Sequence, residues 1–191
     1  MNIITTTYNS NFFYVRPDIS LNRDSNDYFC PDEISEITVA PFLYIRMDKA
    51  GKSVQAKFAS RYYSSIGYGL NLTAKSLIDE KYPQSFLMAN SLDNSTIVSQ
   101  LYATDKFNCA SILQKMLKVD GKRAETIYMD RECAPEKSLA LLEELFNKKT
   151  EVISRLTSFK TGDYIAIEIA EHTPVKIGDI ITFGELKFQI K

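Results

Sequence analysis

The chain has 191 residues, of which 45% are hydrophobic and 25% are charged, as expected for a globular protein with its own core. Its formal charge of -1 gives no overall basic field, so we expect neither nucleic acid nor an anionic membrane as a partner. No apolar stretch has the length of a membrane span, and the N-terminus lacks the pattern of a signal peptide.

Short β-type runs account for most of the predicted structure. Residues 11–16 and 37–47 are rich in aromatic and β-branched residues, which predicts two strands, and residues 48–52 supply a turn after the second. Asp120-Gly121 lies between two short runs and predicts a hairpin. The C-terminal part, from Tyr164 onward, is predicted to be strands and turns throughout.

A short helix is predicted over residues 54–66, because apolar residues recur there at four-residue spacing. Gly67 and Gly69 follow and are typical of a helix end. The apolar stripe consists of Val54, Phe58, Tyr62 and Ile66.

A longer helical pattern follows Pro135, with Glu136 early and Lys148 and Lys149 late, which suits a helix that ends near Asn147. A second short helix is predicted from Thr150. Together these elements predict a single α+β domain over residues 1–191, richer in β than in α.

Isolated residues indicate no catalytic constellation. His172 has no metal-type partner nearby and is expected at the surface, while Glu143 and Glu144 are adjacent on a helix and therefore do not face the same way. No serine lies in a nucleophile-elbow pattern, and no glycine-rich phosphate loop is present. The three cysteines, Cys30, Cys109 and Cys133, lack metal-type spacing and suit inert thiols in a reducing cytoplasm.

Three stretches together resemble the fumarylacetoacetate hydrolase family, in its 2-hydroxyhepta-2,4-diene-1,7-dioate isomerase-like branch. They are "FYVRPDISLNRDSNDYFCPD", "RMDKAGKSVQAKFASRYYSSIGYGLNLTAKSL" and "PVKIGDIITFGELKFQIK". The middle stretch is the most specific, because the family typically shows "GK…FAHRYYDEIGLGIDFTARDL". The positions that match are Phe58-Ala59, Arg61-Tyr62-Tyr63, Ile66-Gly67, Gly69 and Thr73-Ala74.

The resemblance implies a mixed β-roll or barrel with a few flanking helices, usually paired as a homodimer. Family members commonly bind Mg²⁺, Mn²⁺ or Ca²⁺ and hydrolyse, decarboxylate or isomerise 2-oxo or diketo acids. Two Glu residues of one strand and one Asp hold the ion. In this chain the two Glu positions fall on Ala40 and Phe42, and the Asp position falls on Asn71. We therefore expect no metal cofactor, since a hard divalent cation needs oxygen ligands.

The resemblance also locates other pocket positions. The family lysine of the "AKGFDGS" pattern falls on Asn90, whereas Asp93 of that pattern remains, and Arg16 stands where a lysine often precedes Pro-Asp. The loop that lines the substrate carboxylate site falls on residues 168–172 and begins at Glu168, with one residue deleted. The N-terminal lid is expected to be shortened to "TYNSN".

An alignment shifted by one or two residues would instead make Asp32, Glu33 or Glu36 displaced metal ligands. Sequence matches on both sides of the strand argue against that shift, and a one-residue slip would turn every side chain to the other face. Pro41 lacks an N–H for a sheet ladder, which suggests a strand no longer held in register for a site.

Two functional hypotheses remain from the sequence. In the first, the chain is a non-catalytic homologue with a vestigial pocket and a role in binding or assembly, as a homodimer or with an active relative. In the second, it is an enzyme of oxo or diketo acids with a metal-independent mechanism. The candidate groups for that mechanism are Arg16, Lys75, Asp93 and His172.

Overall fold

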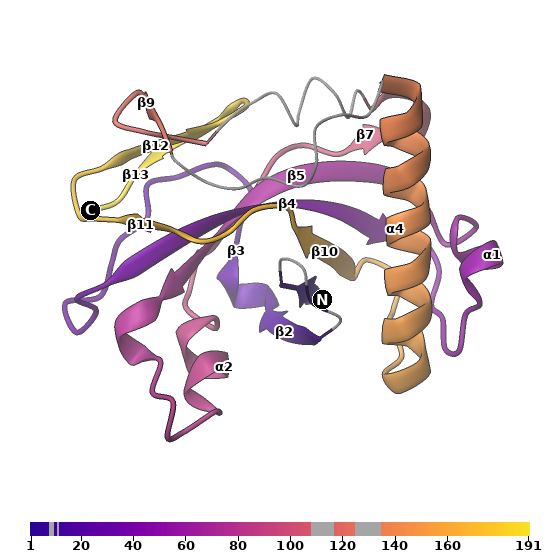
Figure 1. The fold of residues 1–191 in the computed structure, drawn as a ribbon, viewed down its shortest axis with the longest axis horizontal. Coiled ribbons are helices and arrows are strands. Elements are labelled where there is room, and N and C mark those ends of the chain that lie inside the picture. Colours follow the sequence, from indigo (N-terminus) through magenta and orange to yellow (C-terminus); the bar gives the residue numbers. More distant parts are fainter. Residues whose placement is uncertain (8–9, 11, 108–116, 125–134) are drawn as a thin grey trace.

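The computed structural model describes residues 1–7, 10, 12–107, 117–124 and 135–191. A nine-stranded mixed sheet forms its centre, in the order β2-β1-β10-β4-β5-β6-β3, with β11 beside β4 and β7 beside β5. The sheet curls around the core (Figure 1). Its strands are β1 (Asn2–Thr6), β2 (Phe13–Pro17), β3 (Leu21–Asn22), β4 (Ile37–Met47), β5 (Tyr63–Ala74), β6 (Thr96–Val98), β7 (Tyr102–Ala103), β10 (Tyr164–Glu168) and β11 (Thr173–Val175).

A second sheet of four short strands lies at the C-terminal end of the fold, in the order β13-β12-β8-β9. Its strands are β8 (Lys118–Val119), β9 (Lys122–Arg123), β12 (Ile180–Phe183) and β13 (Leu186–Gln189). Asp120 and Gly121 join β8 to β9 with φ of 50° and 74°, as a two-residue type I′ turn requires. The predicted hairpin and the predicted C-terminal strands are therefore confirmed.

Helices are few and lie around the sheets. α4 (Pro135–Leu156) stands across one end of the long strands and packs against α1 (Ala56–Ala59), as Figure 1 shows. The other helical segments are α2 (Ser85–Ala89), η1 (Asp18–Ser20), η2 (Lys75–Leu77) and η3 (Thr104–Lys106). In the described part of the chain, no helix combines the length and apolar character needed to cross a bilayer.

Both predicted helix boundaries were wrong. The helix expected over residues 54–66 is only α1, and Ile66, Gly67 and Gly69 belong to β5. Pairing with the full length of β4 satisfies the backbone of this segment, which overrides the local four-residue spacing. α4 is continuous from Pro135 to Leu156, and its i,i+4 pair Glu144–Lys148 spans Asn147, where an end was expected.

The prediction that Pro41 marks a strand no longer held in register was also wrong. β4 is a central strand, and its pairing with β5 runs without a break from Ile37 to Arg46. The Pro41 carbonyl accepts from Ile169 N, so its missing N–H faces residues 169–172, where β10 has ended and β11 has not begun. The proline thus occupies a gap in the ladder and does not free the strand from its register.

Candidate functional site

The candidate site lies where β4, β5, β10 and β2 come together. Ala40 on β4 pairs with Asn71 on β5, and Phe42 pairs with Glu168 on β10. Arg16 projects from β2. All five side chains are essentially buried, with exposed fractions of 1% or less, so they line no water-filled opening. The structure therefore brings together most of the positions predicted for the pocket.

Phe42 fills the centre of this region. Its ring belongs to an apolar cluster with Ile3, Tyr44 and Val98 among its members. It also lies across Gly69, since a Cβ added to that glycine would be 2.4 Å from Phe42 Cζ. Glycine is needed there to admit the aromatic ring, and the Phe42 side chain is wholly buried.

Tyr44, two residues further along β4, also packs against a glycine of β5. A Cβ on Gly67 would lie 2.5 Å from Tyr44 Cε1, and the Tyr44 hydroxyl donates to the carbonyl of Ser99 at 2.8 Å. Burial raises the pKa of Tyr44, which remains protonated and serves as a hydrogen-bond donor. Two aromatic rings thus lie over two glycines of the neighbouring strand.

Glu168 is a carboxylate buried inside the fold. Its Oε1 accepts from the Tyr14 hydroxyl at 3.1 Å and from Asn71 Nδ2 at 3.3 Å, and its Oε2 faces His172 Nε2 at 3.4 Å. Burial acts to raise the pKa of Glu168, but His172, the Asn71 amide and the charge of Arg16 outweigh it. The pKa of Glu168 is therefore lowered, and the group is an ionised acceptor at neutral pH.

His172 lies at the surface of the fold, as the sequence predicted. Its side chain is 32% exposed, with Nε2 toward Glu168 and Nδ1 3.0 Å from Thr38 Oγ1. Both ring nitrogens are therefore engaged by the protein. Thr38 and Glu168 thus contact the imidazole ring from two sides.

Arg16 is held by neutral oxygens. Its guanidinium donates to Asn90 Oδ1 at 2.9 Å, to the Leu72 carbonyl at 2.8 Å and to Ser95 Oγ at 2.7 Å. Thr73 donates to the same Asn90 oxygen. No carboxylate of the described residues forms an ion pair with Arg16. The guanidinium is thus a fixed part of the core, connecting β2 to β5.

Other predicted residues lie outside this cluster. Asp93 and Lys75 are exposed, and so are Asp32, Glu33 and Glu36, which precede β4. Sequence reasoning missed Tyr14, Thr38 and Thr73, because only the strand pairing brings them to the site. The described part of the proposed lid is limited to Thr7 and Ser10, since residues 8, 9 and 11 lie outside the described residues, as do Cys109 and Cys133. Cys30 is half-buried with a free thiol.

The donor set does not suit a hard divalent cation. Ala40 and Phe42 have no ligand atom, and Asn71 offers only a neutral oxygen beside the single carboxylate of Glu168. Among the residues that the structure describes, no group of three or more His, Cys, Asp or Glu side chains lies close enough to bind a metal ion.

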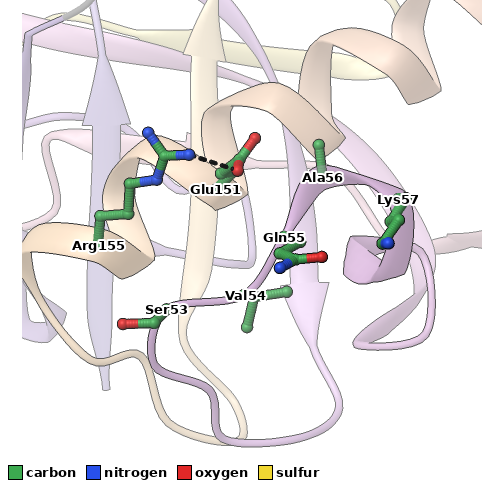
Figure 2. Close-up of a pocket in the computed structure, with 7 residues that line it drawn as sticks. All are labelled: Ser53, Val54, Gln55, Ala56, Lys57, Glu151 and Arg155. Atoms are coloured by element: carbon green, nitrogen blue, oxygen red, sulfur yellow. Dashed lines mark hydrogen bonds and ion pairs between the residues drawn. The ribbon is translucent and has the colours of Figure 1, made fainter.

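Open concavities occur elsewhere, between α1 and α4. Figure 2 shows one, of about 500 Å³, lined by residues 53–57 and by the Glu151–Arg155 ion pair of α4. A second, of about 390 Å³, continues along α4 past Lys57 to Glu143 and Lys148. None of the predicted pocket residues lines either concavity.

The curled mixed sheet, with its second small sheet and few helices, is the fumarylacetoacetate hydrolase fold. The sequence matches no family profile and no curated protein. Solved structures match over nearly the whole chain, at identities that establish the fold alone.

Three of these structures illustrate the match. Fumarylpyruvate hydrolase from Pseudomonas aeruginosa, in complex with Mn²⁺ and pyruvate, is 14% identical with a TM-score of 0.73, covering 100% of this chain and 89% of its own. A protein from Yersinia pestis CO92 assigned to the fumarylacetoacetate hydrolase family is 15% identical, with a TM-score of 0.73 and coverages of 100% and 92%. 2-Hydroxyhepta-2,4-diene-1,7-dioate isomerase from Mycobacterium marinum is 17% identical, with a TM-score of 0.73 and coverages of 99% and 73%. The predicted fold class is thus confirmed.

Proposed function

We propose that this chain is a non-catalytic member of the fumarylacetoacetate hydrolase family that acts through binding or assembly. The observation that carries the proposal is the Phe42 ring, wholly buried over Gly69, at a position where the family resemblance places a metal-binding carboxylate. Ala40 and Asn71 replace the other two carboxylates. An attraction between one carboxylate and a divalent ion is worth several kcal/mol at moderate dielectric, so losing all three removes useful affinity.

The rival proposal, a metal-independent enzyme, has less support. It requires a base and a charged group that reach one substrate, and the candidates do not converge. Arg16 is buried among neutral oxygens, both nitrogens of His172 are engaged, and Asp93 and Lys75 are exposed. The burial of Glu168 also argues against a substrate site at this carboxylate.

Assembly is the role that a retained fold with a filled pocket supports best. We propose a homodimer in the cytoplasm, with an active relative as a second possible subunit. Sedimentation equilibrium of the purified chain tests the homodimer: a dimer at micromolar concentration supports it, and a monomer throughout that range contradicts it.

Calorimetric titration with Mn²⁺ tests the lost metal site. We expect no binding with a dissociation constant below about 1 mM, the weak end of protein sites for hard cations. Fumarylpyruvate hydrolase from Pseudomonas aeruginosa, titrated in parallel, is the positive control. If this chain binds Mn²⁺ stoichiometrically and the Phe42→Ala variant binds it equally well, the metal site lies elsewhere. If Glu168→Gln abolishes that binding, the metal site lies in this pocket. Either result contradicts the proposal.

A further inference from the structure

The outer face of the small sheet is strongly basic. Alternate residues of a strand point to opposite sides, and Val119, Ile181 and Phe188 of this sheet lie in one row on the side facing the core. The residues between them form the outer surface, which we call the basic face. It consists of Lys118, Arg123, Ile180, Thr182, Lys187 and Gln189.

The strand register places the three cations in one row. Arg123 is directly opposite Lys118, Lys118 is opposite Thr182, and Thr182 is opposite Lys187. All three cations are exposed, and none forms an ion pair with a described carboxylate. Like charges directly opposite each other on neighbouring strands destabilise a sheet, so the Arg123–Lys118 pair costs stability, and no carboxylate of the described residues forms an ion pair with either residue.

We propose that the basic face binds an acidic peptide segment of a partner protein. The row crosses four strands, or three strand spacings, which is about 14 Å. An extended peptide places alternate side chains on one side, and residues i, i+2 and i+4 span about 13 Å. A segment with acidic residues at alternate positions therefore matches the row, with Ile180 as an apolar contact and the Thr182 hydroxyl as a donor.

Other anionic partners fit less well. Single-stranded nucleic acid is bound on aromatic stacking platforms, and none of the six side chains of the basic face is aromatic. Anionic membranes are recognised by clusters of about 4–8 basic residues, more than this face carries. The inference does not depend on catalytic status, because the small sheet is separate from the buried cluster around Phe42.

Fluorescence anisotropy with a labelled (Glu-Ser)₄ peptide tests the proposal on the full chain. The triple variant Lys118→Gln, Arg123→Gln, Lys187→Gln removes the row. The control variant Lys49→Gln, Lys52→Gln, Lys160→Gln makes the same charge change with three exposed lysines near the Gly51–Phe159 bridge. Circular dichroism confirms that each variant is folded.

We expect the parent and the control variant to bind the peptide equally, and the row variant to bind about tenfold more weakly, as three exposed ion pairs allow. Raising the salt from about 0.1 M to about 1 M, which shortens the Debye length from about 10 Å to about 3 Å, should abolish binding. Equal loss in both variants overturns the proposal, as does undetectable binding by the parent. Tighter binding of phosphatidylserine vesicles or oligo-dT than of the peptide also overturns it.

Discussion

Replacing Phe42 by alanine measures how completely the pocket has become core. The side chain is fully buried between the apolar cluster and Gly69, with the Tyr44 ring centroid 5.9 Å away. Truncation of a core phenylalanine costs about 3–5 kcal/mol, and two central paired strands leave the backbone little freedom to collapse into the cavity. We therefore expect Phe42→Ala to lower the free energy of unfolding by about 3–5 kcal/mol.

Urea titration followed by circular dichroism gives the assay, and an unchanged m-value shows that stability alone has changed. For a chain of this length the expected loss corresponds to a decrease in Tm of roughly 6–20 °C. Phe12→Ala is the matched control, since Phe12 is 84% exposed and its truncation should change stability by no more than about 0.5 kcal/mol. A Phe42→Ala variant within about 1 kcal/mol of the parent would refute the filled-pocket reasoning.

Three further predictions follow from the same site. Gly67→Ala should destabilise the parent yet be tolerated in a Tyr44→Ala background, because the three atoms nearest to the new methyl group all belong to Tyr44. A coupling energy below about 0.5 kcal/mol in a double-mutant cycle would contradict the contact. Glu168→Gln should destabilise by about 1–3 kcal/mol at pH 7, as when a buried hydrogen-bonding partner is lost. Because folding lowers the pKa of Glu168 from its ordinary value of 4.5, its stabilising contribution is complete above that value. It disappears as the pH falls through the folded pKa, so the urea midpoints of parent and variant should converge in acid, and a constant difference would argue against the linkage. Asn71→Asp alone should leave Mn²⁺ binding undetectable by calorimetry, since Phe42 still occupies the pocket, and millimolar or tighter binding would disagree with that view.

Local sequence signals predicted β2, β4, the hairpin at Asp120-Gly121 and the C-terminal strands, but they did not predict β1 or β5. The bounds of β4 follow from a mostly apolar run without carboxylates, between acidic residues and turn residues. Asp120-Gly121 predicts a hairpin because both residues adopt positive φ readily. The failure at residues 54–66 has a tertiary cause. Gly67 and Gly69 interrupt no helix; they admit aromatic rings from β4, and only the strand register shows that requirement.

The site was predictable only as far as the family resemblance reached. It identified Arg16, Ala40, Phe42, Asn71, Asn90 and Glu168, which the fold brings together. The partners Tyr14 and Thr38 were missed, because Tyr14 is 154 residues from Glu168 and Thr38 is 134 residues from His172 along the chain. Asp93 lies apart from the buried cluster, on an exposed turn just before the buried Ser95 that contacts Arg16.

The central claim is that this chain keeps the family fold without its metal-dependent chemistry. An ultraviolet assay of acylpyruvate loss in the presence of excess Mg²⁺ or Mn²⁺ tests this claim most directly. Fumarylpyruvate hydrolase from Pseudomonas aeruginosa, assayed on fumarylpyruvate, is the positive control. We predict no turnover of acylpyruvates or fumarylpyruvate by this chain above the rate in buffer. Saturable hydrolysis by the unmodified chain that a chelator abolishes would contradict the account and place the chain among the active members of the family.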